Sequence, residues 1–214
     1  MSSEVPDGRP GRRSSPVPAT AETRERILTA TRELLDERRF DTLSVADILV
    51  AAGVSRASFY FYFPNKQAVL ADLVREAVAG GQRAAQPWIG EEQDSVAALR
   101  AGVRDGARLW RENAGVLRAI VESWGSDDDL RALWLAQMNL FTEAAAARIE
   151  ADPEARRRLG DLDGRAVAAS LSWLGERLYY LAAAGVPPFD DEQVLVDVLT
   201  NAWTSALYGR ANVA

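Results

Sequence analysis

The part of the chain that most constrains its fold is the segment 44–70, which reads SVADILVAAGVSRASFYFYFPNKQAVL. Ser44 is placed to cap a helix over residues 45–52, and Asp47, three residues later, supports the same turn. Gly53 ends this helix, because glycine adopts the left-handed backbone conformation without a steric cost. The segment therefore begins with a short helix that has a defined start and a defined end.

A second short helix follows after the glycine turn. Ser55 can cap it over residues 56–62, and Pro64 stops it, because proline cannot continue a helix. A longer helix over residues 66–83 comes next. Two short capped helices joined by a glycine-containing turn predict a helix-turn-helix.

The rest of the chain is also expected to be helical. Apolar residues recur at helical spacing, and strand-type alternation extends over no useful length. We expect an all-α fold of about nine helices: a three-helix N-terminal domain that contains the helix-turn-helix, followed by a larger helical domain. Besides the helices above, the predicted ranges are 22–38, 94–112, 114–124, 127–151, 164–184 and 190–209.

The composition narrows the classes of function. The chain has no cysteine and no histidine, which removes disulfides, the common metal ligands and the usual general base. We therefore expect no enzyme, cofactor or metal; the alternative is an acid-base enzyme that uses Glu122, Glu143 and Glu176. No apolar run approaches the roughly 18 residues of a membrane span, so a soluble cytoplasmic protein without a membrane partner is expected.

The charge is unevenly distributed along the chain. The net charge is −6, but residues 1–83 carry 12 basic and 11 acidic side chains, whereas the remainder carries 13 and 20. Residues 1–20 are expected to be a disordered basic arm, either solvated or in contact with phosphates. The DNA-binding domain is expected over 21–66, extended by the helix through residue 83, and the second domain over 84–214, after a loop with Pro87 and Gly90.

The second short helix has an inward and an outward side. Val54, Phe59 and Phe63 are spaced to lie inward. This leaves other residues of the helix on the surface that can enter a major groove. The outward residues are Arg56, Ala57, Ser58, Tyr60 and Tyr62.

This stretch resembles the TetR family of regulators. The matching positions are Ser44, 52–55 (AGVS), 59–63 (FYFYF), Lys66 and Leu70, with mild departures at Leu49 and Ala57. The resemblance implies contacts with bases or the adjacent backbone for Arg56, Ala57, Ser58 and Tyr60. It implies phosphate contacts for Ser44, Tyr62 and Lys66. The full predicted DNA-contacting set is Ser44, Val45, Ser55, Arg56, Ala57, Ser58, Tyr60, Phe61, Tyr62 and Lys66.

Three members of this set have alternatives. Arg56 can bond guanine, or it can be solvated or bound to phosphate. Phe61 can touch thymine methyl groups or pack on the first helix. Lys66, the only lysine in the chain, opposes the helix dipole at a helix N-terminus, so an anionic partner explains it better than plain solvation.

The rear of the chain combines large aromatic and small residues. Trp110 lies one turn after Gly106, and Tyr179 one turn after Gly175. Ordinary core packing is the simpler interpretation of each aromatic residue, but small residues beside large ones can also leave a cavity with apolar walls.

Here the chain resembles the ethionamide-resistance regulator branch of the TetR family, which has a long hydrophobic tunnel in each subunit. Where those relatives carry two amide side chains, this chain has Ser172 and Gly175, which puts their ligand hydrogen bonds in doubt. The adjacent Glu176–Arg177 pair is expected to be a structural salt bridge. The predicted ligand-contacting set is Leu99, Gly106, Trp110, Trp134, Met138, Phe141, Ser172, Gly175, Tyr179 and Trp203.

The last two predicted helices have apolar faces too wide for one core, which indicates a partner helix. The marker residues are Leu171, Leu174, Leu178 and Leu181 on one helix, and Val194, Val198, Ala202 and Leu207 on the other. The resemblance implies a two-fold dimer through these helices and a palindromic operator. The sequence thus predicts a repressor released from double-stranded operator DNA by a small hydrophobic effector; the alternative is a regulator without such an effector, or an activator.

Overall fold

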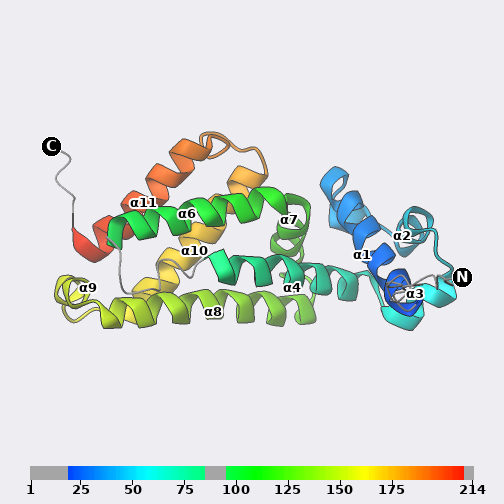
Figure 1. Ribbon diagram of the computed structural model, residues 1–214, viewed down its shortest axis with the longest axis horizontal. Coiled ribbons are helices and arrows are strands. Elements are labelled where there is room, and N and C mark those ends of the chain that lie inside the picture. Colours follow the sequence, from blue (N-terminus) through cyan, green and yellow to red (C-terminus); the bar gives the residue numbers. More distant parts are fainter. Residues whose placement is uncertain (1–18, 85–94, 210–214) are drawn as a thin grey trace, which may run out of the picture.

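The computed structural model describes residues 19–84 and 95–209 of the chain. Within these ranges it consists of ten α-helices and one short 3-10 helix, with no β-strand (Figure 1). The all-α prediction is confirmed, with one helix more than expected. Most of the predicted basic arm and the loop with Pro87 and Gly90 lie outside the described residues.

Three helices and the 3-10 turn form one end of the molecule, here called the head (Figure 1). Their bounds are Ala19–Glu37 for α1, Phe40–Thr42 for η1, Val45–Ala52 for α2 and Arg56–Tyr62 for α3. Ile27 and Leu28 of α1, Ile48 of α2 and Phe59 of α3 are fully buried at their centre. These residues belong to a hydrophobic core that continues from the head into the rest of the molecule.

The predicted helix caps are present in the head. The Ser44 hydroxyl accepts a hydrogen bond from the Asp47 backbone, and the Asp47 carboxylate accepts one from the Ser44 backbone, which completes a capping box. The Ser44 hydroxyl also donates to the Asp47 carboxylate at 2.6 Å, and this bond is the largest cause that holds the pKa of Asp47 down at about 2. Gly53 has φ of 60°, and Ser55 accepts from the Ser58 backbone at 3.0 Å.

Helix α4, Lys66–Ala84, runs from the head into the rear of the molecule (Figure 1). The ion pair Arg32–Glu76, at 2.9 Å, and the pair Arg24–Asp72 tie α1 to it. Further along, α4 packs against α6, α7 and α8. A single rigid element therefore belongs to both parts of the protein.

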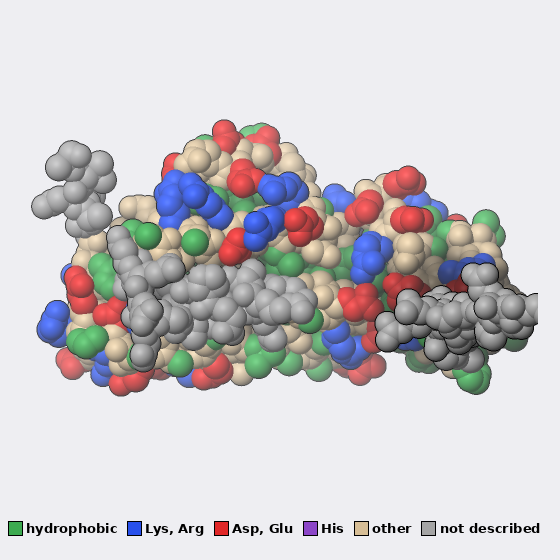
Figure 2. Space-filling model, viewed as in Figure 1, with side chains coloured by type: hydrophobic (Ala, Val, Ile, Leu, Met, Phe, Trp, Pro, Cys, Tyr) green, Lys and Arg blue, Asp and Glu red, His purple; other side chains and the backbone are tan. Residues whose placement is uncertain are grey.

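The remaining helices form the rear domain. Their bounds are Ser95–Glu112 for α6, Ala114–Ser123 for α7, Asp128–Ala151 for α8, Pro153–Leu159 for α9, Gly164–Ala183 for α10 and Glu192–Tyr208 for α11. The last four each begin at an aspartate whose side chain accepts backbone N–H groups. On the face shown in Figure 2, acidic and basic side chains are interspersed over this domain, in keeping with α6–α11 ion pairs such as Arg100–Asp197.

Helix α9 is the element that the sequence reasoning missed. Asp152 ends α8 and caps α9, accepting from the backbones of Glu154 at 2.9 Å and Ala155 at 3.2 Å. Pro153 occupies the first turn, where its missing N–H costs nothing. The Tyr208 hydroxyl also donates to Asp152, at 2.9 Å, which ties the end of α11 to this corner.

The head and the rear domain also meet directly, where α7 crosses α1. A Cβ added to Gly115 would lie 2.6 Å from the backbone oxygen of Leu35, so only glycine allows this approach. Nearby, Glu122 accepts a hydrogen bond from the Tyr180 hydroxyl at 3.2 Å and lies 3.5 Å from Arg39 of the head. The two parts therefore touch through backbone as well as through polar side chains.

The predicted apolar faces of α10 and α11 are only partly free. Leu174 and Val198 are 38% and 42% exposed. Three of the marker residues are instead buried within the chain: Leu171, Leu178 and Leu207. These three pack in the rear core, so the free apolar face is narrower than the sequence indicated.

The described parts of the chain lack two kinds of feature. No helix there is both long enough and apolar enough to cross a bilayer. The same residues contain no group of three or more acidic, histidine or cysteine side chains arranged to hold a metal ion.

Candidate DNA-binding surface and ligand cavity

The exposed side of α3 is the candidate DNA-binding surface. Phe59 and Phe63 are buried with ring centroids 6.1 Å apart, as the sequence predicted, and they anchor the helix. Tyr60 and Phe61 are 47% and 77% exposed, which excludes the alternative that Phe61 packs on the first helix. Arg56 is exposed and has no hydrogen bond or ion pair with any described residue, so its guanidinium is available to a partner.

The other predicted DNA-contacting residues lie in the same head. Ser44, Ser55 and Ala57 are exposed, whereas Val45, Ser58, Tyr62 and Lys66 are half-buried. Because Ser44 and Ser55 also cap helices, a phosphate contact would be an additional role for them. Their contacts with DNA stay predictions.

Arg26 of α1 holds the helix-turn-helix in shape, a role that the sequence reasoning did not identify. Its guanidinium donates to the backbone oxygens of Ala52 at 2.6 Å and Gly53 at 2.8 Å. These bonds satisfy carbonyl groups at the C-terminal end of α2, where helix carbonyls lack partners. Arg26 thereby fixes the turn that sets the angle of α3.

Lys66 has partners within the head. Its ammonium donates to the backbone oxygens of Phe40 at 2.8 Å and Leu43 at 2.6 Å, and lies 4.6 Å from the centre of the Phe40 ring. Burial lowers its pKa, but the two carbonyls favour the charged form. The ammonium therefore has an internal role as an anchor of α4 on η1, and its phosphate contact stays a prediction.

A cavity of about 190 Å³ lies in the rear domain, between α4, α6, α7, α8, α10 and α11. All ten predicted ligand-contacting residues line it. The sequence reasoning assigned no cavity role to ten further lining residues: Val78, Gly102, Val103, Asp105, Leu109, Leu117, Ala144, Ala145, Leu171 and Glu176. Several could have been found as the i, i+3 and i+4 neighbours of predicted residues on the same helices.

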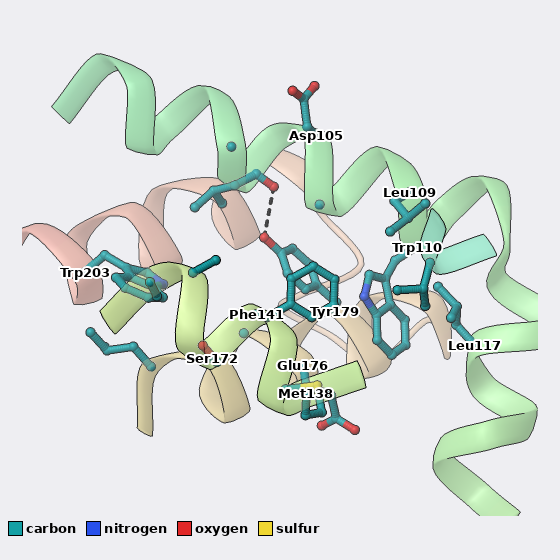
Figure 3. A pocket seen from close by; sticks show the side chains of 18 of the residues that line it. Asp105, Leu109, Trp110, Leu117, Met138, Phe141, Ser172, Glu176, Tyr179 and Trp203 are labelled. Atoms are coloured by element: carbon teal, nitrogen blue, oxygen red, sulfur yellow. Dashed lines mark hydrogen bonds between the residues drawn. The ribbon is translucent and has the colours of Figure 1, made fainter. Parts of the chain in front are cut away.

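Aromatic rings form one wall of the cavity. Trp110 stacks on Tyr179 with centroids 6.2 Å apart and meets Trp134 edge-on at 6.4 Å. The Tyr179 hydroxyl donates to the backbone oxygen of Val103 at 3.0 Å (Figure 3). A Cβ on Gly106 would lie 2.6 Å from that hydroxyl oxygen, so the glycine is what lets Tyr179 reach across to α6. Burial raises the pKa of Tyr179, which keeps it a neutral donor.

Glu176 is the buried acidic residue of the lining, with 3% of its side chain exposed. It accepts a hydrogen bond from the Trp134 indole at 3.4 Å, and its other oxygen lies 3.9 Å from Arg177. Burial raises its pKa. The expected Glu176–Arg177 ion pair is present, but it is long.

The acidic residues considered for catalysis do not form one site. Glu143 pairs with Arg165 at 2.7 Å on the outside of the domain, whereas Glu122 is engaged at the junction with the head and Glu176 in the cavity. The three carboxylates therefore have separate partners.

Comparison with known proteins adds two family matches. The family of bacterial regulatory proteins of the tetR type matches residues 27–73, and the C-terminal domain of the transcriptional regulator EthR matches residues 99–209. The two matches correspond to the head with the start of α4, and to the rear domain.

Whole-chain relatives agree with these matches. The HTH-type transcriptional regulator EthR of Mycolicibacterium smegmatis is 30% identical over 203 residues, which cover 93% of this chain and 92% of that protein. EthR of Mycobacterium tuberculosis H37Rv is 29% identical over 193 residues, 89% of each chain.

Solved structures share the fold at lower identity. A TetR-family transcriptional regulator from Syntrophomonas wolfei has a TM-score of 0.69 at 18% identity, over 91% of this chain and 99% of that one. NalD of Pseudomonas aeruginosa, the secondary repressor of the MexAB-OprM multidrug efflux pump, has a TM-score of 0.67 at 20% identity, over 86% and 97%. These likenesses concern the arrangement of helices.

Proposed function

Because the chain belongs to the TetR family of bacterial transcriptional regulators and carries the EthR type of C-terminal domain, we propose that it is a repressor that a small apolar effector releases from its operator. It is a DNA-binding regulator, as members of this family are. What we propose beyond this is that it represses transcription and that its effector is a small apolar molecule.

The observation that carries the proposal is the double role of α4. Val78 of this helix lines the cavity, while Lys66 at its first turn is bonded to Phe40 and Leu43 of the head. Arg24 and Arg32 of α1 are paired with further residues of α4. An occupant that displaces α4 in the rear domain would therefore displace the head with it.

On the DNA side, α3 would enter the major groove with Arg56 and Tyr60 toward the bases or the adjacent backbone. An arginine that bonds guanine in two places contributes about 1–3 kcal/mol of discrimination. Ser44, Tyr62 and the third N–H of Lys66 would reach phosphates, which position the helix without reading sequence.

A dimer through α10 and α11 would present two such helices. Exposed Leu174 and Val198 would pack at its two-fold axis. The operator would then be palindromic, with half-sites separated by about 34–36 Å or a multiple of that distance. An effector that changes the separation of the two heads lowers affinity, and operator DNA weakens effector binding by the same factor.

The test uses the full-length protein and the DNA between its gene and the neighbouring gene. Fluorescence anisotropy should show salt-dependent binding, and 1-octanol, as an apolar probe, should weaken it. Calorimetric titration with 1-octanol should give a lower affinity for the DNA-bound protein than for the free one. Equal affinity in both states would remove the effector from the proposal and favour a regulator without one.

A further inference from the structure

The cavity has a polarity that an apolar effector alone does not explain. Among the described residues, its lining contains two acidic side chains, Asp105 and Glu176, and no lysine or arginine. Asp105 forms an ion pair with Arg108 at 2.6 Å, and its carboxylate points away from the cavity in Figure 3. Glu176 lies deep in the domain, and the electrostatic character of the cavity therefore depends mainly on this one side chain.

Glu176 is under-supplied with hydrogen-bond donors for a buried carboxylate. An ionised carboxylate can accept about four hydrogen bonds. Among the described residues its one donor is the Trp134 indole, at a long 3.4 Å. Arg177 lies beyond hydrogen-bond distance at 3.9 Å, is 53% exposed, and has its guanidinium 5.2 Å from the Tyr180 ring centre. Buried polar groups are nearly always better satisfied than this.

The rings near Glu176 suit a positive charge. The indole of Trp134 meets the indole of Trp110 edge-on, and Trp110 in turn stacks on Tyr179. Aromatic faces attract ammonium groups through their quadrupole, most strongly where water is excluded. Carboxylate and rings thus share one wall of a cavity whose other walls are apolar.

We propose that the cavity selects a cationic amphiphile, an apolar molecule whose protonated amine donates to Glu176 while its hydrocarbon body occupies the rest of the cavity. This rests on the proposed function and names the effector class. Anionic molecules such as fatty acids are disfavoured, because no basic residue among the described residues lines the cavity and an ionised Glu176 would repel them. The bound ammonium would favour the ionised form of Glu176, in opposition to burial, which raises the pKa of this carboxyl.

The test compares three probes with the same hydrocarbon body: octylammonium, 1-octanol and octanoate. Each is titrated calorimetrically into the full-length protein at neutral pH. Octylammonium should bind about tenfold or more tightly than 1-octanol, since it adds a charge-assisted hydrogen bond and ring contacts. Octanoate should bind least tightly.

Two variants test which acidic residue causes the preference for octylammonium over 1-octanol. Glu176→Gln keeps the shape and an acceptor for the Trp134 indole, and it should reduce the ratio between octylammonium and 1-octanol to about threefold or less. Asp105→Asn removes the other acid of the lining and should leave the ratio as in the wild type. Circular dichroism melting confirms that both variants are folded.

Each contrary result has its own meaning. If 1-octanol binds as tightly as octylammonium, or if Glu176→Gln keeps the wild-type ratio, the assignment of a cationic effector is overturned while apolar release stands. If none of the three probes binds, both the cationic class and the effector role are overturned. DNA binding by the free protein, measured separately, decides whether the operator part of the proposed function survives.

Discussion

The head and the rear domain both place aromatic residues in their interiors, but with opposite results for packing. In the head, Phe59 and Phe63 fill a solid core. In the rear domain, Trp110 and Tyr179 border a cavity. The difference lies in the residues beside the rings, because a Cβ added to Gly175 would meet only the Tyr179 ring, at 3.6 Å. Aromatic residues at helical spacing predict an apolar interior, and their small neighbours decide whether it is filled.

The largest expected effect is on stability, and it tests whether the head is more tightly packed than the lining of the cavity. Phe59→Ala should lower the free energy of unfolding by about 3–5 kcal/mol, since it empties a fully buried site. Phe141→Ala, at the half-buried cavity wall, should cost clearly less, because that side chain already borders empty space. Urea denaturation of both variants measures the difference; equal losses would contradict the contrast between solid and hollow parts.

The next experiment separates the contribution of a head residue to DNA binding from its contribution to the stability of the fold. Arg56→Ala should weaken operator binding by about 1–3 kcal/mol, through loss of a base or phosphate contact, with an unchanged melting temperature. Arg157→Ala is the matched control, since it removes an equally exposed arginine from the rear domain. Fluorescence anisotropy at several salt concentrations measures both, and identical affinities for the two variants would remove Arg56 from the interface.

A third experiment fills the cavity of the rear domain with a larger side chain. Gly175→Trp should occupy the cavity in place of an effector and weaken operator binding by about tenfold, within the usual range of allosteric coupling. Gly175→Ala should have little effect, because its Cβ would meet Tyr179 at an ordinary 3.6 Å. If the filled protein is folded and still binds the operator with wild-type affinity, the cavity is not coupled to the head.

The smallest effect concerns the acid in the cavity. Because burial raises the pKa of Glu176, its ionisation opposes folding. The wild type should therefore lose stability relative to Glu176→Gln as the pH rises from the ordinary glutamate pKa of about 4.3 through the higher folded value. Melting curves from about pH 4 to pH 8 should show the melting temperature of the variant rising relative to that of the wild type toward the upper end. A variant that melts lower throughout would show that Trp134 and Arg177 stabilise the carboxylate.

Local features of the fold were predictable from the sequence. Ser44, Gly53 and Ser55 act on backbone groups within a few residues, so their roles can be inferred from the chain itself. The ten predicted cavity residues follow from helical spacing and family resemblance. The helix over 153–159 also had local signals, an aspartate cap and a proline at the first position, which the reasoning passed over.

Contacts between residues far apart in the chain could not be predicted from the sequence. Arg26 is bonded to Ala52 and Gly53, and Lys66 to carbonyls more than 20 positions earlier in the chain. The spacing of Glu176 from Ser172 and Tyr179 places it on the cavity side of its helix, but nothing in that spacing indicated that it would accept from the Trp134 indole. Such pairs depend on how helices cross, which a single sequence does not reveal.

Helix α4 can transmit a displacement from the cavity to the head. Twelve residues separate Val78 from Lys66, and at 1.5 Å per residue they lie about 18 Å apart along a rigid rod. A push of about an ångström at the cavity end would be delivered almost undiminished to the far end, since a helix does not compress as a loop would. In a two-fold assembly the symmetry-related helix would move by the same amount, so the gap between the paired heads would change by up to twice the displacement of one head.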